Sequence, residues 1–590
     1  MQKYLLVTVF VMFKLFCSAQ GTYIPLGSEA YQYMDRIDIK YGRVMPIAFT
    51  ADKPYRRKSI AKISETLQLS NLRFNKVQEA EIKYLAEENA EWLDSVHPYK
   101  NRVWLKALYT ESANFYTVSS KKKGLFDLRI NPMLGLTLGD ASKGRFIFSR
   151  TAGLEVRGNI KKVLSFYFNA TGNDEHTPDY VENVIMPATA YYQSGPNPRA
   201  YAYVPGQAYW KDYSSNGLGY RNAIDYFDAR GYVNVNILKY INLTVGRDKN
   251  FIGDGQRSLI LSDFSAPYFF MKFNVRFWRI NYENIFAQLT GQYQRGLDQV
   301  LPKKYMALHH LSVQATPWLN LGIFESVIFN RSDNFELQYL NPIIFYRAVE
   351  AALGSPDNVM LGGDFKANIA GQAQLYGQLV IDDISFKNFF KKNGYWGDKW
   401  ALQLGAKYVD ILPNLDAQVE FNYVRPFMYT HSDGSDSYTN YNQPLADPLG
   451  ADFYELIFNL HLHPTAKLSF NAKYMLAQVS GDTLINNIMS NYGGNIFQPS
   501  NPSGSLLITP IPGYTDNAFG HKLGQGVKSF INYFEFAATY QIWHNINFDA
   551  TILYRSQSSL TSPNNPLQGQ STFVFTLGAR VNIARRTYLF

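Results

Sequence analysis

Apolar and polar residues alternate one by one over most of the chain, from about Leu125 onward. Between Leu415 and Tyr423 every odd-numbered residue is apolar, and the residues between them are polar or charged. Successive side chains of a β-strand point to opposite faces, so each such segment has one apolar and one polar face. The same alternation is found over 269–277, 468–474, 546–554 and 573–583. The pattern predicts strands that each present one face to an apolar environment.

Eighteen segments of this kind can be counted along the chain. They cover about residues 126–138, 144–157, 162–172, 230–238, 240–248, 267–276, 280–293, 304–315, 319–329, 358–368, 372–382, 399–409, 415–426, 451–463, 467–478, 527–542, 546–556 and 571–584. After every even-numbered segment the connection has roughly five residues or fewer, whereas most odd-numbered segments are followed by a long connection. The long connections are 173–229, 249–266, 330–357, 383–398, 427–450, 479–526 and 557–570.

This order of connections separates two fold classes. A soluble β-protein would show the same alternation within its strands, but short periplasmic turns that alternate with long external loops are typical of bacterial outer-membrane barrels. We therefore predict an all-β fold, an 18-stranded antiparallel transmembrane β-barrel over residues 126–590, with both chain ends in the periplasm. Phe590, which follows Tyr588, resembles the terminal aromatic residue that serves such barrels as an assembly signal.

The register assigns individual side chains to lipid or lumen. Phe421 and Phe470 belong to the apolar face, which is expected to meet lipid. Asn422 and Asn471 belong to the opposite face, where an arginine should do less damage than on the lipid face.

Residues 20–125 have a different pattern and predict a small helical section on the periplasmic side. One helix is expected over 28–39, a second from Pro54 to about Gln68, and a third that Ser70 caps and that runs to about Trp92. In the third helix one side is apolar, and the opposite side is expected to be solvated. The acidic residues of that side are Glu79, Glu81, Glu87 and Glu88. Packing of these helices against the barrel is a better interpretation than a catalytic role.

Residues 1–19 predict a secretory signal peptide. Lys3 is followed by an apolar run over 4–16, and Cys17-Ser18-Ala19 places small residues before a cleavage site at Gln20. The run is too short to span a membrane as a helix. A lipoprotein signal at Cys17 is the alternative, although Phe16 is large for the preceding position. Because Cys17 is the only cysteine, the mature chain is expected to contain no disulfide, thiolate nucleophile or cysteine metal site.

The composition agrees with an exported barrel. The chain contains 43 Tyr and 41 Phe residues, as expected for aromatic girdles at both membrane interfaces. No stretch of 18 apolar residues is present, so helical membrane spans are not expected. The net charge of +9 is compatible with anionic glycans or lipid head groups. The basic residues form no cluster in the sequence, so no nucleic-acid partner is predicted.

The segment 245–263 is the most distinctive motif. Asp254 lies between two glycines suited to a tight turn, and no βαβ unit surrounds the motif, which excludes a dinucleotide site. One interpretation is an inward-folded loop that presents charged side chains to a solute, and the other is a salt-bridged structural loop that blocks the lumen. The charged candidates are Arg247, Asp248, Asp254, Arg257 and Asp263.

A helix is expected over 342–353, within the long connection 330–357. Asn341 can cap it, Pro342 suits its first turn and Gly354 follows its end. Arg347 and Glu350 lie three residues apart on one face. Such a helix would cap the barrel or fold into it. We predict that it and the loop 249–266 both fill the lumen and close it, since their charges would be costly in lipid.

The long connection 173–229 is rich in aromatic residues, which can stack on the C–H faces of sugars. The stacking candidates are Tyr191, Tyr192, Tyr209, Trp210 and Tyr213. Packing against neighbouring loops is an equally good interpretation. His309 and His310 are adjacent on a predicted strand, so they point to opposite faces and cannot share a metal. We find no local signature of a hydrolase and predict no enzymatic activity, metal or cofactor.

Several motifs resemble Wzi-type capsule-assembly proteins. They are YIPLGSEAY at 23–31, the segment 246–263, YLNP at 339–342 with Arg347 and Glu350, GSPDN at 354–358 and LYGQLVID at 375–382. The chain is most similar to the Bacteroidota branch of this family, which includes the gliding-motility protein RemB. The tyrosine-rich connection 173–229 is longer than the resemblance leads us to expect.

The resemblance implies an 18-stranded barrel of the cell outer membrane with a periplasmic helical section. It also implies a lectin-like role that binds or anchors capsular or other surface polysaccharide, and it carries no catalytic residues across. Three alternatives remain open: a component of gliding-motility or surface-adhesin machinery, a passive porin, and an outer-membrane enzyme. The predicted partners are therefore outer-membrane lipid, surface polysaccharide and, in the first alternative, gliding or adhesin machinery.

Overall fold

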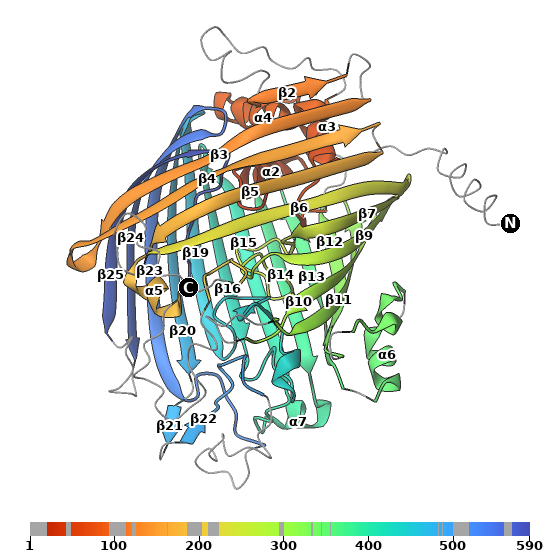
Figure 1. Ribbon diagram of the computed structural model, residues 1–590, viewed down its shortest axis with the longest axis vertical. Coiled ribbons are helices and arrows are strands. Elements are labelled where there is room, and N and C mark those ends of the chain that lie inside the picture. The colour runs from red at the N-terminus through yellow and green to blue at the C-terminus, as the bar shows by residue number, and fades with distance from the viewer. Residues whose placement is uncertain are drawn as a thin grey trace, which may run out of the picture.

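The computed structural model describes residues 21–42, 49–93, 114–120, 125–161, 163–185, 203–209, 223–293, 300–331, 334–343, 345–354, 356–481, 483–485, 488–499, 518–559 and 569–590. Within these residues, 18 strands form a closed antiparallel barrel (Figure 1). The prediction of an 18-stranded antiparallel barrel is confirmed. The predicted signal peptide, 1–19, lies outside the described residues.

Each barrel strand pairs with the next one along the chain, and the last strand closes the barrel on the first. The strands are β3 (Phe126–Ala141), β4 (Arg145–Ile160), β5 (Leu164–His176), β6 (Ile224–Leu238), β7 (Ile241–Asp248), β9 (Tyr268–Phe277), β10 (Ile280–Thr290), β11 (Lys303–Thr316), β12 (Leu319–Phe329), β13 (Asn358–Ile369), β14 (Ala373–Asp383), β15 (Lys399–Leu412), β16 (Leu415–Val424), β19 (Phe453–Thr465), β20 (Leu468–Gly481), β23 (Val527–Trp543), β24 (Ile546–Ser559) and β25 (Gln570–Val581). The short strand β2 (Tyr116–Ser119) pairs with the first part of β3.

The connections alternate as the sequence predicts. After every even-numbered barrel strand except the last, the connection has two or three residues, as at Pro413-Asn414, and these turns gather at one end of the barrel (Figure 1). We call this the short-turn end, and the opposite end the loop end. Short turns are the periplasmic connections of outer-membrane barrels, so the loop end is the external one.

The two faces of the barrel wall differ in polarity. Phe421 of β16 is exposed on the outer face, whereas its neighbours Glu420 and Asn422 are fully buried in the lumen. A band of exposed apolar side chains surrounds the barrel on the outside. It includes Leu136, Phe269, Ile323, Leu404, Phe458, Phe548 and Leu577. None of the helices in the described part of the chain has the length and apolar character needed to cross a bilayer.

Three helices lie in the mouth of the barrel at the short-turn end (Figure 1). They are α2 (Ala30–Tyr41), α3 (Arg57–Gln68) and α4 (Lys76–Glu88), followed by the 3₁₀ turn η1 (Ala90–Trp92). They share an apolar core of their own that includes Met34, Ile60 and Leu85. Helix α2 contacts β13 and β15, and α4 contacts β19. We call residues 21–93 the N-terminal plug.

Two details of the predicted helices are wrong. Asn75, and not Ser70, caps α4, because its side-chain oxygen accepts hydrogen bonds from the backbone N–H groups of Val77 and Gln78. The Ser70 hydroxyl instead donates to the Leu67 carbonyl oxygen. Glu81 is also buried and not solvated, with its carboxylate 3.3 Å from Arg36 Nε.

Glu88 is buried as well, beside Arg57. Two of the four acidic residues of α4 therefore pack against ion-pair partners inside the barrel mouth, whereas Glu79 is exposed as predicted.

Smaller elements lie in the connections. They are β1 (Asp52–Lys53), which pairs with β8 (Phe251–Ile252), the 3₁₀ turns η3 (Ser142–Gly144), η7 (Leu337–Leu340) and η8 (Gly434–Asp436), the helices α5 (Asp179–Ile185), α6 (Tyr346–Ala352) and α7 (Phe386–Lys391), and the short hairpins β17 (Thr439–Asn440) with β18 (Gln443–Pro444) and β21 (Thr483–Ile485) with β22 (Ile488–Ser490).

The residues after β25 turn back into the lumen, which contradicts the predicted periplasmic position of the chain end (Figure 1). Arg585 and Arg586 form ion pairs with Glu535 and Glu175 of the inner wall, at 2.7 and 2.5 Å. Phe590 is buried inside the barrel, 5.9 Å from the Tyr180 ring. The alternation could not predict this turn, because it follows from acidic partners that other strands contribute.

Candidate functional site

The connection between β7 and β9 folds into the lumen. Arg257 of this loop is buried, with Nη2 2.7 Å from Glu455 Oε1 on β19. The same Nη2 donates a hydrogen bond of 3.0 Å to the Leu589 carbonyl oxygen. The backbone N–H of Arg257 donates to Glu420 of β16, at 3.0 Å. The loop is therefore tied to the opposite wall of the barrel and to the last residues of the chain.

Other charged side chains of this motif also have partners inside the protein. Asp254 Oδ1 accepts a hydrogen bond of 2.5 Å from the Thr50 hydroxyl of the N-terminal plug. Lys249 Nζ donates to the backbone carbonyl of Asp263, at 2.9 Å. Burial lowers the pKa of Lys249 to about 8, and the nearby Arg230 adds to this effect. These contacts resemble a salt-bridged structural loop more than a set of free groups that face a solute.

Arg247 and Asp248 end β7 and point to opposite sides of the wall. Asp248 faces the lumen, 3.7 Å from Arg230 Nη1. Arg247 pairs in register with Phe269 of the outer face, and its guanidinium donates to the Ala229 carbonyl oxygen. The prediction that Arg247 faces the lumen is wrong because β7 continues through this residue, and strand parity then directs its side chain outward.

Helix α6 does not fill the lumen. It lies outside the barrel, against the outer faces of β12 and β13 (Figure 1). The helix begins at Tyr346, and Asn341 accepts only a local hydrogen bond from the Ile343 N–H, at 3.1 Å. Arg347 and Glu350 pair with each other at 2.8 Å. The prediction of a second lumen-filling segment, 342–353 with an Asn341 cap, is therefore wrong.

Only one of the five predicted stacking residues can be located. Tyr191, Tyr192, Trp210 and Tyr213 lie outside the described residues. Tyr209 is half-buried, and its ring centroid lies 5.3 Å from that of Tyr293. It thus packs against the β10–β11 connection, in line with the packing interpretation for this residue.

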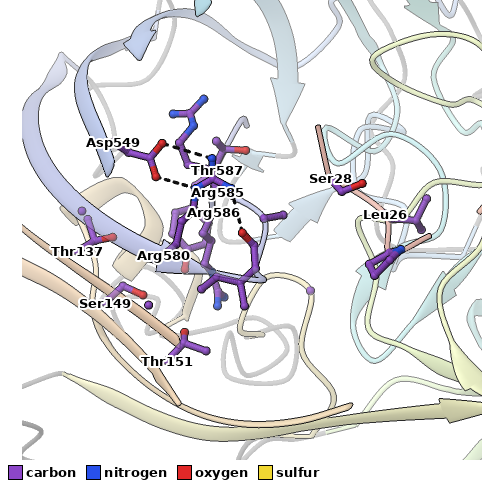
Figure 2. Close-up of a pocket in the computed structure, with 18 of the residues that line it drawn as sticks. Leu26, Ser28, Thr137, Ser149, Thr151, Asp549, Arg580, Arg585, Arg586 and Thr587 are labelled. Atoms are coloured by element: carbon purple, nitrogen blue, oxygen red, sulfur yellow. Dashed lines mark hydrogen bonds and ion pairs between the residues drawn. The ribbon is translucent and has the colours of Figure 1, made fainter. Parts of the chain in front are cut away.

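A cavity of about 810 Å³, lined by many polar and charged side chains, lies in the lumen along β3–β6, β20 and β23–β25. Figure 2 shows Arg580, Arg585 and Arg586 on one side of it, with Thr137, Ser149 and Thr151 among its other lining residues. Arg580 is paired with Asp549 at 2.7 Å and with Glu29 of the plug at 2.6 Å. The cavity walls are thus charged, but the guanidinium groups are neutralised by carboxylates.

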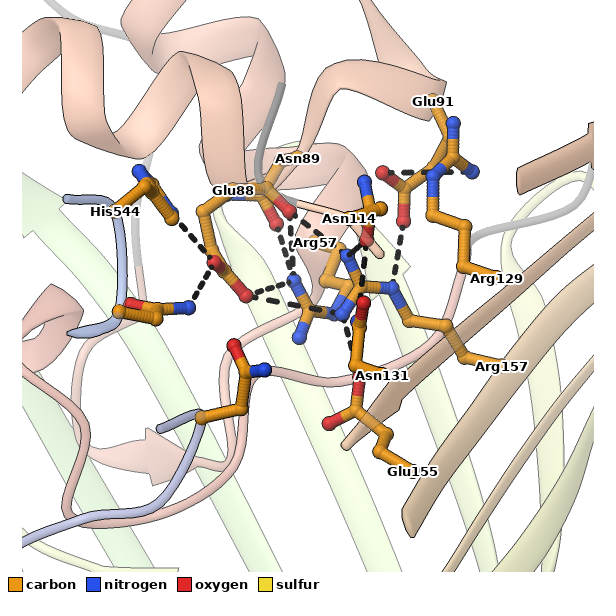
Figure 3. Close-up of polar contacts among 12 residues, drawn as sticks. Arg57, Glu88, Asn89, Glu91, Asn114, Arg129, Asn131, Glu155, Arg157 and His544 are labelled. Atoms are coloured by element: carbon orange, nitrogen blue, oxygen red, sulfur yellow. Dashed lines mark hydrogen bonds and ion pairs between the residues drawn. The ribbon is translucent and has the colours of Figure 1, made fainter. Parts of the chain in front are cut away.

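A buried layer of ion pairs, shown in Figure 3, lines the cavity where the N-terminal plug meets the barrel wall. Arg57 of α3 lies with Nη1 2.8 Å from Glu88 Oε1 of α4. Arg157 of β4 pairs with Glu155 at 2.7 Å and lies 3.4 Å from Glu91. The layer therefore joins the N-terminal plug to the barrel wall.

His544 completes this layer from the turn between β23 and β24. Its Nε2 lies 2.9 Å from Glu88 Oε2, and its ring stacks on Tyr84 at 4.4 Å. Burial alone would lower the pKa of His544, but hydrogen bonds to Glu87 and Glu88 raise it to about 9. Burial would raise the pKa of Glu88, yet Arg57 and His544 hold it well below its usual range.

The two adjacent histidines of β11 point to opposite sides of the wall, as the sequence predicts. His310 is buried in the lumen between Asp52 of the plug, at 2.6 Å, and Asp364 of β13, at 2.7 Å. His309 faces outward and contacts the Tyr282 hydroxyl at 2.8 Å. Among the residues with described positions, no three His, Cys, Asp or Glu side chains are grouped so that they could hold a metal.

Half-buried aromatic side chains gather at the loop end. The ring of Tyr395 lies 5.8 Å from Trp396 and 5.7 Å from Phe519. We call these three residues the aromatic platform. The Trp396 ring packs on the ring of the fully buried Phe427, at 6.2 Å, and the backbone N–H of Trp396 donates to the Ala518 carbonyl oxygen, at 3.0 Å.

The platform joins two connections, 384–398 and 482–526, that lie far apart in the sequence. The alternation therefore could not indicate it, and the only local signal is the run GYWG at 394–397. Rings with a free edge and an apolar face are suited to stacking on sugars.

Comparison with known proteins identifies a family and solved structures with a similar fold. A sequence profile described as "Capsule assembly protein Wzi" matches residues 197–555. Wzi of Escherichia coli, described as an outer-membrane protein involved in group 1 capsule assembly and a carbohydrate-binding β-barrel, has a similar structure, with a TM-score of 0.53 and 12% sequence identity. The similarity covers 96% of this chain and 100% of that one.

The structure of OprD from Pseudomonas aeruginosa is more distant, with a TM-score of 0.38 and 12% identity over 77% of this chain and 94% of that one. No curated protein matches the sequence.

Proposed function

The chain belongs to the Wzi family of capsule assembly proteins, and from this premise we propose that it is a closed barrel that binds surface polysaccharide and anchors it at the outer membrane. Carbohydrate binding is the described property of the E. coli protein, which shares the fold of this chain. The observation that carries the proposal here is the aromatic platform, which presents half-buried rings at the external end of the barrel.

The contents of the lumen support an anchor over a pore. The N-terminal plug, the β7–β9 loop and the residues after β25 all contribute to the filling, and each forms ion pairs with the wall. The connection 425–452 adds Tyr429 and Tyr438, whose hydroxyls donate to carbonyl oxygens of the β7–β9 loop. A polymer would therefore be held at the loop end and would not pass through the barrel.

Binding to capsular polysaccharide purified from the same strain tests the proposal. The protein in detergent is expected to bind the polymer in a co-sedimentation assay, and the Trp396→Ala variant is expected to bind at least tenfold more weakly. Trp278→Ala is the control, because Trp278 is also a tryptophan with an accessible ring, more exposed than the half-buried Trp396, but lies in a short turn at the opposite end. No binding by the wild type, or equal loss in both variants, would count against the platform.

The gliding or surface-adhesin role rests on the sequence resemblance alone. It predicts that a deletion strain loses spreading motility but keeps its surface polysaccharide, whereas the proposed function predicts loss of retained polysaccharide. The proposed role is not enzymatic. The tyrosine-rich connection 173–229 stays a second candidate for sugar stacking.

A further inference from the structure

The outer wall carries a polar patch where lipid would be expected. Asn284 of β10, His309 of β11 and Glu325 of β12 are paired in register across three adjacent strands. Asn284 and His309 face outward, because their chain neighbours Glu283 and His310 are buried in the lumen. Glu325 faces the same side, because it is paired in register with His309. Polar and ionisable groups on a lipid-facing surface are costly, so this row requires a cover.

The connection between β12 and β13 provides the cover. Glu325 accepts hydrogen bonds from the backbone N–H groups of Tyr346 and Arg347, at 2.7 and 2.8 Å. The Tyr346 ring lies 4.0 Å from the His309 ring, and the Tyr282 hydroxyl donates to the Pro342 carbonyl oxygen. We call residues 334–354 the outer flap.

Apolar contacts hold the flap on the wall. Tyr339 and Tyr346 are fully buried against outward-facing residues of the strands beneath them. These are Phe286, Tyr305, Ala307, Val327, Phe329 and Val359. The flap is thus an ordered part of the wall, even though it lies in a long connection.

The opposite side of the flap is apolar and open. Leu337, Ile343 and Phe345 are 72%, 84% and 73% exposed, and α6 adds the exposed Ala348, Ala351 and Ala352 to the same stretch. Between residues 337 and 354 the only charged side chains are Arg347 and Glu350, which pair with each other. The neighbouring helix α7 is more polar, since Lys387 and Lys391 lie within it and Lys392 follows its end.

The flap extends along the outer wall from the loop end toward the short-turn end. Its contact Tyr282 is the third residue of β10, which begins directly after the short turn 278–279. In register, Tyr282 faces Leu311, and Leu311 faces Ile323, which is 57% exposed on the lipid side. The apolar surface of the flap is therefore continuous with the apolar band of the barrel.

We propose that the outer flap lies in the apolar layer of the outer membrane, with Leu337, Ile343 and Phe345 inserted among the acyl chains. Amphipathic segments of this kind lie in the interface plane with their apolar face in the acyl region. Here the backbone polar groups of the flap form hydrogen bonds with Glu325 and Tyr282 of the wall, and the Tyr346 ring contacts His309. The flap then shields these groups from lipid, and lipid covers the flap. The proposal does not depend on polysaccharide binding.

Site-specific fluorescence quenching tests the proposal. In a Cys17→Ser background, which has no other cysteine, single cysteines at Ile343 and Phe345 are labelled with an environment-sensitive dye. The full-length protein is reconstituted in phosphatidylcholine vesicles, with either brominated acyl chains or iodide in the buffer. Two control positions calibrate the result: Ile323→Cys on the lipid face and Val300→Cys, which is 87% exposed at the loop end.

Labels at both flap positions are expected to be quenched by brominated chains within about twofold of the Ile323→Cys label, and to resist iodide. Quenching by iodide as strong as at Val300→Cys would overturn the proposal, because the flap would then face water. Protection from both quenchers would also overturn it, because a second copy or another protein would then cover the flap. Heat modifiability on a gel verifies that each variant has folded.

Discussion

Arg257 and Glu455 form a buried ion pair across the lumen, with 2.7 Å between Nη2 and Oε1. The arginine belongs to the inward-folded loop and the glutamate to β19, so the pair connects segments that are 198 residues apart. Asp447 lies 3.6 Å from the same guanidinium, and burial together with Glu455 raises the pKa of Asp447 to about 8. The Arg257 guanidinium therefore joins the loop to β19 and to the connection 425–452.

Substitution of this arginine is expected to destabilise the barrel. Arg257→Ala leaves the carboxylate of Glu455 buried without its partner, which should lower the free energy of unfolding by about 3–5 kcal/mol. Urea unfolding in detergent micelles, followed by tryptophan fluorescence, measures the change. Arg247→Ala is the control, because Arg247 lies on the outer face and donates only to a backbone carbonyl. Similar losses in both variants would contradict the assigned role of the pair.

The lipid face can be tested with one pair of variants. Phe421→Arg places a charge among the acyl chains and should cost about 2–4 kcal/mol if Phe421 lies near the bilayer midplane. Asn471→Arg should be milder, because Asn471 lines the polar cavity. The fraction of protein that becomes heat-modifiable on a gel measures assembly. Equal damage in both variants would show that the assignment of the two faces is wrong.

His544 is expected to make the free energy of unfolding depend on pH between 6.5 and about 9. The pKa of this histidine is raised from 6.5 to about 9 in the folded protein. A raised pKa contributes stability below pH 6.5, and this contribution is lost as the pH rises from 6.5 through 9. The denaturant midpoint of the wild type should therefore fall over this range.

The His544→Gln variant isolates that contribution. It keeps a hydrogen-bond donor near Glu88 but cannot become charged, so its denaturant midpoint should change less between pH 6.5 and 9. Glu87, Glu88 and Tyr84 of α4 all face this side chain, and the comparison with the wild type removes their own titration. An identical pH dependence in the two proteins would exclude His544 as the cause.

The sequence predicts the barrel well, because strand parity and connection length are local properties. The alternation around Phe421 and the turn at Pro413-Asn414 suffice to assign the faces and the ends. The alternation does not predict which lumen-facing side chains have hydrogen-bond partners. Asn422 bonds to Gln403, Glu420 and Glu455, so the expectation that Asn422→Arg is mild no longer holds there.

The candidate site is less predictable from the sequence, because its contacts join residues that lie far apart in the chain. Arg257 was identifiable as a charged residue of an inward-folded loop, but its partner Glu455 comes from a distant strand. The platform of Tyr395, Trp396 and Phe519 likewise requires two distant connections to meet. Helix α6 was expected inside because its charges suggested a polar environment. In the structure Arg347 and Glu350 neutralise each other on the outside.

The last prediction concerns permeability. An 18-stranded barrel is wide enough for an aqueous channel unless something fills it. The wild type is therefore expected to conduct little in planar bilayers, because the inward-folded loop and the N-terminal plug occupy its lumen. Replacing residues 249–266 by a short glycine-serine linker removes the Arg257–Glu455 pair and the β1–β8 pairing, and should raise the conductance at least tenfold if the barrel assembles.

The flap offers a matched control for this deletion. Replacing residues 334–354 by the same linker removes a segment of similar length from the outer wall and should leave the conductance unchanged, since α6 contacts β12 and β13 from outside. Each variant must first show heat modifiability, so that only assembled barrels are compared. A wild type that conducts like an open porin would contradict the closed anchor, because the segments that fill the lumen would then be permeable to ions.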